Sequence, residues 1–208
     1  MRIVCISDTH EQHRSIELPP GDMLIHAGDL TYKGEAHAVK DFLDWFSAQP
    51  HKHKIFIAGN HDFLFENLSP FPGKYGDLTY LEQQSTEIEG LLIFGSPITP
   101  RFGNWAFMEE RGDDIKYFWD EIPRGTDILI THGPPAGILD VTAPRWGSLN
   151  AGCFDLKKAV DRVKPKLHVF GHIHSAYGKL EQDGTIFVNA STCNEEYDPL
   201  NPPIVIDL

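Results

Sequence analysis

The sequence predicts an α/β fold with a mixed β-sheet. Short apolar runs alternate with segments whose apolar residues recur at three- and four-residue steps, an order typical of α/β proteins. Most runs are continuously apolar instead of alternating, which indicates strands that are buried on both faces. The last third brings short strands close together and ends in "NPPIVIDL", which favours neighbouring antiparallel strands there.

Seven strands and three helices are expected. The strands are predicted at 2–7, 22–27, 54–59, 91–96, 127–132, 167–172 and 185–190. The helices are predicted at about 35–48, 113–121 and 154–163. No internal repeat and no linker-like change in composition divides the chain, so we expect a single domain over residues 1–208.

Composition indicates a globular protein of the cytoplasm. Hydrophobic residues make up 41% of the chain and charged residues 23%. No apolar run approaches the roughly 20 residues that cross a bilayer, so we expect no membrane partner. The N-terminus carries no signal-like segment. Cys5, Cys153 and Cys193 lack C-x-x-C spacing, which favours reduced thiols.

The net charge of −12 bears on the class of partner. Proteins that bind long nucleic acids present basic surfaces to the phosphate backbone, and no cluster of Lys or Arg stands out here. We therefore expect no long nucleic acid as a partner. A small phosphorylated substrate remains compatible with the charge, because bound metal ions would supply local positive charge.

Polar residues follow five of the predicted strands. Ligands bind beyond the carboxyl ends of strands in open α/β sheets, so these residues are expected to share one site. Among them are Asp8, His10, Asp29, Asn60, His61, Asp62, His132, His172 and His174. Oxygen and nitrogen donors without thiolate suit Mn, Fe, Co, Ni or catalytic Zn, and two ions about 3.5–4 Å apart need a bridging carboxylate.

These segments match a known family. In order, "DTH", "GDL", "GNHD", "THGPP" and "GHIH" resemble the five-block signature of calcineurin-like metallophosphoesterases. Longer blocks such as "LIHAGDL" and "KPKLHVFGHIH" resemble the subgroup of metallophosphoesterase-domain proteins first known from vertebrate brain, with their microbial relatives. The resemblance implies two mixed β-sheets packed together and flanked by helices, with the site on the strand-end loops.

The resemblance also implies a set of metal ligands. One divalent ion would be held by Asp8, His10, Asp29 and His174. The second would be held by Asp29, Asn60, His132 and His172, with Asp29 bridging the two. We expect two ions from Mn, Fe, Zn, Co or Ni, with Mn favoured. Two departures matter: the brain proteins typically carry Glu in place of Asp62, and at least one carries Gly in place of His172.

The implied reaction is the hydrolysis of a phosphoester by a metal-bridging hydroxide. His61 would act as general acid for the leaving oxygen, and Asp62 would orient His61. We expect a phosphodiesterase acting on cyclic or small nucleotides. A phosphomonoesterase for small metabolites or phosphoproteins is the nearest alternative, and a non-catalytic regulatory module is a further one. The sequence leaves both a monomer and a homodimer open.

Substrate contacts are expected from the segment 95–112. Arg101 would pair with a phosphate, and Trp105 or Phe107 would stack on a base. The alternative is that the segment only packs over the core. Asn150 and Arg145 are weaker candidates for an opposite wall. His26 is expected to be a buried structural histidine and not a ligand.

Overall fold

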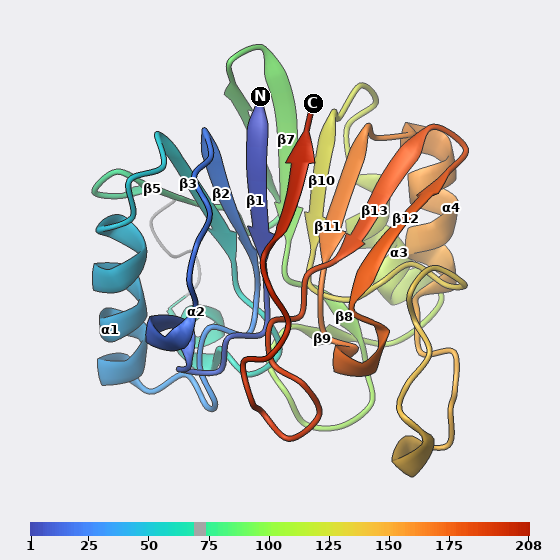
Figure 1. The fold of residues 1–208 in the computed structure, drawn as a ribbon. Helices are drawn as coiled ribbons and strands as arrows, with labels where there is room; N and C mark the ends of the chain where they lie inside the picture. The colour runs from blue at the N-terminus through green and yellow to red at the C-terminus, as the bar shows by residue number, and fades with distance from the viewer. Residues whose placement is uncertain (69–73) are drawn as a thin grey trace.

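The computed structural model, in which residues 1–68 and 74–208 are described, confirms the α/β class (Figure 1). Two six-stranded mixed sheets pack together and are flanked by helices. Both termini lie at the same end of the molecule. No helix among the described residues is long and apolar enough to cross a membrane.

The first sheet has the order β14-β1-β2-β3-β5-β4. Its middle strands β1, β2, β3 and β5 run parallel, and β14 and β4 are antiparallel edges. The strands are β1 (Arg2–Ile6), β2 (Met23–Ala27), β3 (His53–Ile57), β4 (Lys74–Tyr75), β5 (Leu78–Tyr80) and β14 (Ile204–Asp207).

The second sheet has the order β12-β13-β11-β10-β7-β6. Its middle strands are again parallel, with antiparallel edges β12 and β6. The strands are β6 (Gln84–Ile88), β7 (Leu91–Ser96), β10 (Ile128–Thr131), β11 (Leu167–Phe170), β12 (Gly178–Gln182) and β13 (Thr185–Asn189). A separate parallel pair joins β8 (Thr99–Pro100) and β9 (Met108–Glu109).

Successive side chains of a strand point to opposite faces of its sheet, so alternate residues belong to two different layers of the core. Ile3 and Cys5 of β1 join the cluster between the two sheets, together with Ile128 and Ile130 of β10. Val4, the residue between them in sequence, belongs to the cluster under the helices. Because every residue of β2, β10 and β11 is buried, these strands need apolar residues on both faces.

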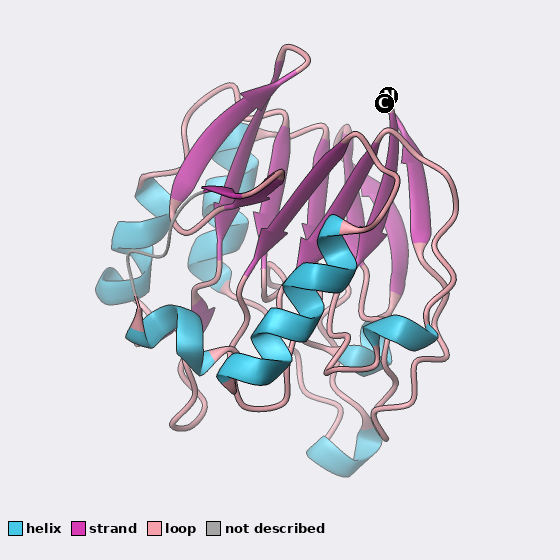
Figure 2. Cartoon of the chain, turned by 90° about the vertical axis from the view of Figure 1, so that its left-hand side faces the viewer, coloured by secondary structure: helices cyan, strands magenta, loops and turns pink. Residues whose placement is uncertain are grey.

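Four helices lie outside the sheets (Figure 2). They are α1 (Ala36–Ser47), the short α2 (Phe63–Asn67), α3 (Asp113–Asp120) and α4 (Phe154–Val163). In α1, Phe42 and Phe46 are four residues apart and lie on one face of the helix. The centroid of each ring lies 6.0 Å from the ring centroid of Phe56 in the first sheet. Three 3₁₀ turns, η1 (His13–Ser15), η2 (Pro144–Trp146) and η3 (His174–Ala176), complete the described elements.

All seven predicted strands and all three predicted helices are present, and several of the strands end one or two residues early. The prediction did not include the short strands β4, β5, β6, β8, β9 and β12 or the helix α2. β6 is mostly exposed and polar, so it carries no apolar pattern. The segment 95–112, expected without regular structure, contains the pair β8–β9.

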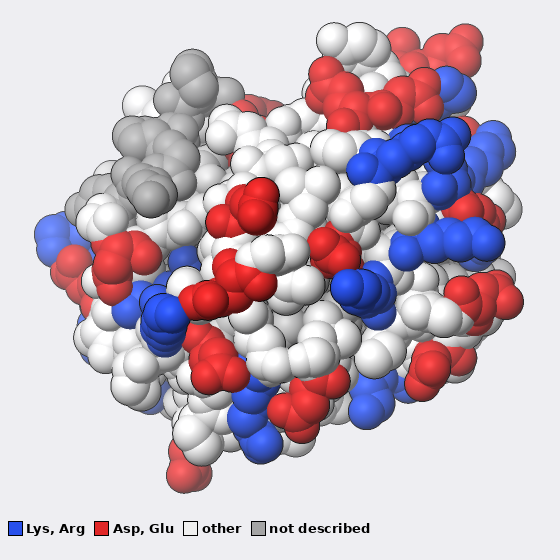
Figure 3. All heavy atoms as spheres, turned by 90° about the horizontal axis from the view of Figure 1, so that it is seen from above, with Lys and Arg blue, Asp and Glu red and all other residues white. Residues whose placement is uncertain are grey.

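The carboxyl ends of the parallel strands of both sheets point to one end of the molecule, opposite the termini (Figure 1). The face at the end where the termini lie carries acidic and basic side chains next to one another, with a short row of basic ones at one side (Figure 3). The loops at the carboxyl ends are therefore where segments distant in sequence meet.

His168 on β11 provides a test of this core. Its ring is fully buried, Nε2 lies 2.8 Å from Thr131 Oγ1, and burial lowers its pKa to about 3. Because the pKa is depressed on folding, the stability due to the neutral ring is present above pH 6.5 and is lost as the pH falls from there towards 3. The slope is up to about 1.4 kcal/mol per pH unit.

We expect His168→Gln to remove this part of the pH dependence. Urea unfolding at pH 7, 6 and 5 should show the stability difference between wild type and variant shrinking as the pH falls. His37→Gln, at an exposed position of α1, is the matched control. Parallel stability curves for wild type and His168→Gln would contradict the buried neutral ring.

Candidate metal centre

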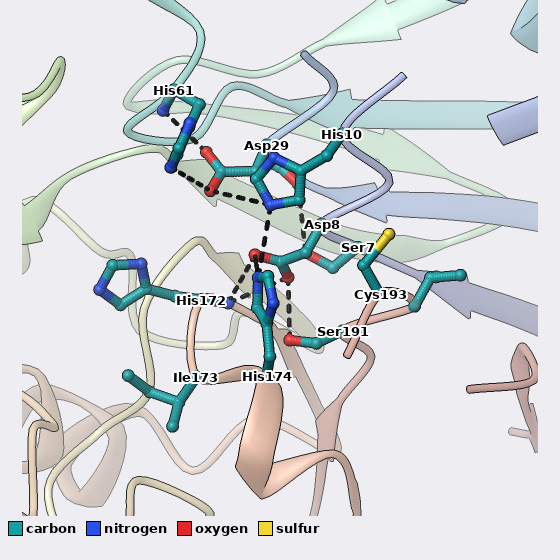
Figure 4. Close-up of polar contacts among 12 residues, drawn as sticks. Ser7, Asp8, His10, Asp29, His61, His172, Ile173, His174, Ser191 and Cys193 are labelled. Atoms are coloured by element: carbon teal, nitrogen blue, oxygen red, sulfur yellow. Dashed lines mark hydrogen bonds and ion pairs between the residues drawn. The ribbon is translucent and has the colours of Figure 1, made fainter. Parts of the chain in front are cut away.

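The expected ligands converge at the carboxyl ends of the two sheets. Figure 4 shows Asp8, His10, Asp29, His172 and His174 of this set. Asp8 and His10 follow β1, Asp29 follows β2, and Asn60 follows β3. From the second sheet, His132 follows β10, while His172 and His174 follow β11. Three groups of these side chains have ligand atoms within 4.8 Å of one another: Asp8–His10–His174, Asp29–His132–His172 and His10–Asp29–His61.

Four of the expected ligands have left-handed backbone. The φ angles are 51° at Asp8, 40° at His10, 57° at Asp29 and 70° at His172. Such a conformation costs a non-glycine residue about 1–2 kcal/mol, and observed strain of this kind is concentrated at functional sites. The strain turns the chain sharply after each strand, so that a side chain at the strand end can face the site.

Asp29 lies at the middle of the cluster. Its Oδ2 is 3.3 Å from His132 Nε2, 3.8 Å from His10 Nε2 and 3.9 Å from His61 Nε2. Its Oδ1 accepts a hydrogen bond of 2.9 Å from the backbone N–H of His61. The carboxylate belongs to two of the three groups, which is the position that a bridging ligand requires.

Asp8 is held by several donors at once. The backbone N–H of His172 lies 3.0 Å from both of its carboxylate oxygens, and the Ser191 hydroxyl donates to Oδ2 at 2.9 Å. His174 Nε2 lies 3.4 Å from Oδ1. Ser191 follows β13, so a sixth strand end contributes to the site.

Backbone carbonyls fix which ring nitrogen faces the site. Nδ1 of His10, His132 and His174 lies 3.2, 2.9 and 2.8 Å from the carbonyls of Thr31, Ala27 and Asn194. A carbonyl only accepts, so each Nδ1 carries the proton and donates. The three Nε2 atoms are then directed at the carboxylates, with His10 Nε2 and His174 Nε2 only 3.3 Å apart.

The "GHIH" segment separates its two imidazoles by a turn and not by strand alternation. β11 ends at Phe170, and His172 has a positive φ. A Cβ at Gly171 would overlap Asp8 Oδ2 and Ser7 Oγ, which explains the glycine. The result is that His174 joins Asp8 and His10, whereas His172 joins Asp29 and His132.

The carboxylates and imidazoles of the centre shift one another's pKa values and attract one another. Burial alone would lower the pKa of His132, but the Asp29 carboxylate outweighs it and raises the pKa to about 9. Asp8 does the same for His174, whose pKa rises to about 9. Burial would raise the pKa of both carboxyls, yet the imidazoles hold the pKa of Asp8 and of Asp29 well below the usual range. His10 and His172 are neutral, because burial lowers their pKa to about 4 and 3.

This donor set fits two divalent cations. Two buried carboxylates face several imidazole nitrogens whose other nitrogens are already bonded, and the amide oxygen of Asn60 lies 2.9 Å from His132 Nε2. Facing lone pairs at such distances repel unless a proton or a cation lies between them. Oxygen and imidazole donors suit the first-row divalent metals, but several of them equally well.

The hydrogen bonds of Asp62 go to the loops after β2 and β3. Its two oxygens accept hydrogen bonds from the backbone N–H groups of Leu30, Thr31 and Gly59 and from the Thr31 hydroxyl, at 2.8–3.1 Å. The ring of His61 instead donates from Nδ1 to the carbonyl of Tyr32 at 2.7 Å. Asp62 therefore clamps the loops after β2 and β3 to each other, and His61 is oriented by the backbone of one of them.

A cavity of about 660 Å³ opens from the metal centre. Of the three expected substrate contacts, Trp105 lines this cavity, with its ring 4.3 Å from that of His61. Phe107 is buried in the core and does not line it. Arg101 is turned to Glu110 at 2.8 Å and to the carbonyl of Met108, because the pairing of β8 with β9 brings these groups beside it.

The sequence predicted the other residues that line the cavity only weakly or not at all. The weaker candidates Arg145 and Asn150 do line the cavity. Phe102, Trp146 and Tyr197 also line it and were not predicted. For Tyr197 the signal was present, since "NASTCNEEY" is a polar segment after a buried strand. Phe102 and Trp146 are single aromatic residues in loops, and nothing local marks them.

We expect the loading of the centre to release protons. In the metal-free protein His132 and His174 carry protons at pH 7, because their pKa values are about 9, and ligation requires neutral rings. Titration of stripped protein with Mn²⁺ in weak buffer with a pH indicator should release about two protons per chain from these rings, in addition to any from metal-bound water, and fewer above pH 9. His51→Gln, at the opposite end of β3 from Asn60 and with its ring at the Pro19 carbonyl, should leave the count unchanged. Binding without proton release would contradict the assigned charges.

Sequence comparisons match the whole site. The model of the calcineurin-like phosphoesterase family matches residues 1–176, which contain every expected metal ligand. Metallophosphoesterase domain-containing protein 1 of Homo sapiens is 41% identical over 232 residues, covering 100% of this chain and 71% of the human protein. A UPF0046 protein of Caenorhabditis elegans is 37% identical over 221 residues, covering 99% of this chain and 74% of that protein.

A solved structure agrees in fold. The phosphopantetheinyl hydrolase of Mycobacterium tuberculosis aligns with a TM-score of 0.61, covering 97% of this chain and 95% of that one. Its sequence is 14% identical, so the likeness concerns the fold alone.

Proposed function

The chain belongs to the calcineurin-like phosphoesterase family, a family of metal-dependent phosphoester hydrolases, and we propose that it is a phosphodiesterase acting on cyclic or small nucleotides. The observation that carries the preference for diesters is the charge of the cavity. Its two arginines are already engaged: Arg145 with Glu195 and Glu196, and Arg111 with the carbonyls of Ala151 and Gly152. A phosphodiester carries one negative charge and needs less compensation than a monoester dianion.

Two of the three groups support the proposed ligand sets, and the 3.8 Å between Asp29 Oδ2 and His10 Nε2 supports Asp29 as the ligand that they share. One ion would be held by Asp8, His10, Asp29 and His174, and the other by Asp29, Asn60, His132 and His172. Mn²⁺ is our preferred ion. When bound, such a pair supplies an activated water and neutralises charge on the phosphoryl group.

His61 is proposed as the general acid. Its Nδ1 is committed to the Tyr32 carbonyl, so Nε2 is the atom that would deliver a proton to the leaving oxygen. The packing of Trp105 against its ring holds that orientation and excludes water from one face. Asp62 would orient His61 indirectly, because it fixes the loop that carries Tyr32, whose carbonyl accepts from the His61 ring.

Further proposals concern the whole protein. We propose a single domain over residues 1–208, and a cytoplasmic location, which the three free and buried cysteines support. The substrate is proposed to be small, with neither long nucleic acid nor membrane as partner, since the chain carries a net charge of −12. A monomer or a homodimer would present the same site.

The first test compares a diester with a monoester. Stripped protein reloaded with Mn²⁺ should hydrolyse bis(p-nitrophenyl) phosphate with a higher kcat/KM than p-nitrophenyl phosphate. Asp29→Ala should abolish both activities and the binding of both ions, as measured by elemental analysis. A preference for the monoester would replace our proposal with a phosphomonoesterase. No turnover of either ester by fully loaded protein would favour a non-catalytic module.

A second test concerns His61. His61→Ala should keep both metals and lose about 10²–10³-fold in kcat on a diester with a poor alkoxide leaving group. With p-nitrophenolate as leaving group the loss should be much smaller, because that anion needs little protonation. His37→Ala, an exposed histidine of α1, is the control. Equal losses with both leaving groups would remove His61 from the role of acid.

A further inference from the structure

The turn between β8 and β9 places two aromatic rings on two different histidines of the centre. The ring of Phe102 lies 5.3 Å from that of His172, and the ring of Trp105 lies 4.3 Å from that of His61. Both rings line the cavity. This turn therefore spans the metal centre, with one aromatic ring near the proposed acid and the other near the far ligand.

The loop after β10 supplies a second apolar surface. Trp146 and Leu149 line the same cavity and are 64% and 62% exposed, and Phe102 is 59% exposed. Exposed apolar surface costs about 25 cal/mol per Å² relative to burial, and an apolar patch of this kind beside a site marks a binding surface. These three side chains form what we call the apolar wall.

Trp146 of the wall is held in place before any ligand arrives. The indole Nε1–H of Trp146 donates to Glu195 Oε2 at 3.2 Å, and the Arg145 guanidinium lies 5.9 Å from the Trp146 ring. Glu195 Oε1 accepts from the backbone N–H of Ser175, next to the ligand His174. A preformed surface loses less side-chain entropy on binding, so it contributes more to affinity.

The charged side chains beside the wall already have partners. Arg145 is paired with Glu195 at 2.9 Å and with Glu196 at 3.0 Å. Arg111 donates to two backbone carbonyls, each at 2.9 Å. An anionic group placed against the wall would meet the Glu195 carboxylate and would find both arginines that line the cavity already engaged.

We propose that the apolar wall binds the ester group that stays on phosphorus, and that it selects substrates in which this group is apolar or aromatic and uncharged. This proposal rests on the proposed function. In-line displacement puts the leaving group beside the acid, which is the side of His61 and Trp105. The retained group is equatorial on phosphorus, away from the leaving group, and the apolar surface that the cavity offers it there is the wall, in which Phe102 lies beside His172.

The test uses two diesters with the same leaving group. Bis(p-nitrophenyl) phosphate retains an aryl group and methyl p-nitrophenyl phosphate retains a methyl group, and both expel p-nitrophenolate. In Mn²⁺-loaded wild type we expect kcat/KM for the aryl ester to be about tenfold higher, mainly through KM. A carboxymethyl analogue, which adds an anion to the retained group, should react no faster than the methyl ester.

Two variants assign the preference to the wall. Phe102→Ala and Trp146→Ala should each reduce the aryl-to-methyl ratio of kcat/KM several-fold, mainly by raising KM for the aryl ester. Tyr117→Ala, which removes an equally exposed aromatic ring on α3 outside the cavity, is the matched control. Any difference in intrinsic reactivity between the esters is the same for every variant and cancels from the comparison.

The outcomes separate this inference from the proposed function. If both diesters are hydrolysed but neither variant changes the aryl-to-methyl ratio, the proposal that the wall binds the retained group is wrong. The proposed phosphodiesterase activity would still stand. Faster reaction of the carboxymethyl ester would overturn the selection against anions. Absence of turnover of every diester by loaded wild type would overturn the proposed function, and this inference with it.

Discussion

The structure depends on the buried carboxylate of Asp29. A charged carboxylate removed from water costs several kcal/mol unless charges and hydrogen-bond donors surround it. Here the imidazole of His132 lies 3.3 Å away, His10 and His61 lie just beyond, and the backbone N–H of His61 donates to it. Because these partners come from both sheets, the same carboxylate that would bridge two ions also ties the sheets to each other.

The loops around Asp29 are fixed by backbone interactions as much as by ligands. Asp62 joins the loops after β2 and β3 through four hydrogen bonds, and its pKa is raised to about 6, first by burial and then by the nearby Asp29. Such a buried acid is tolerated because the donors it binds are otherwise unsatisfied backbone groups. A site of this kind is rigid before any metal or substrate arrives, which is what positioned chemistry requires.

Chemistry and selectivity are divided between different segments. The proposed metal ligands and the proposed acid His61 lie at or just after the strand ends, where the parallel strands converge. Much of the cavity wall comes instead from the turn between β8 and β9 and from residues 142–151 around η2, which contain none of the proposed ligands. Loops can change without disturbing the sheets, so relatives with the same centre are free to accept different esters.

The sequence by itself determined the buried strands, the three longer helices and which polar residues follow the strands. Continuous apolar runs predicted the buried strands because burial on both faces leaves no room for polar residues. Polar residues after those runs predicted which side chains come together, since carboxyl ends of parallel strands meet. It did not predict β6, an exposed edge strand held by its neighbour's hydrogen bonds, and it assigned 95–112 no regular structure.

Tertiary structure decided what no local pattern encodes. The partners of Asp62 and of the His61 ring depend on where the backbone of Leu30–Tyr32 lies, which is set by turns with positive φ. Phe107 and Trp105 are both aromatic residues of one segment, yet one enters the core and the other faces the cavity. The composition of the segment 95–112 and the spacing of its aromatic residues do not distinguish a ring in the core from a ring at the cavity. Only the packing of that segment against the loops and the core decides which ring a substrate can reach.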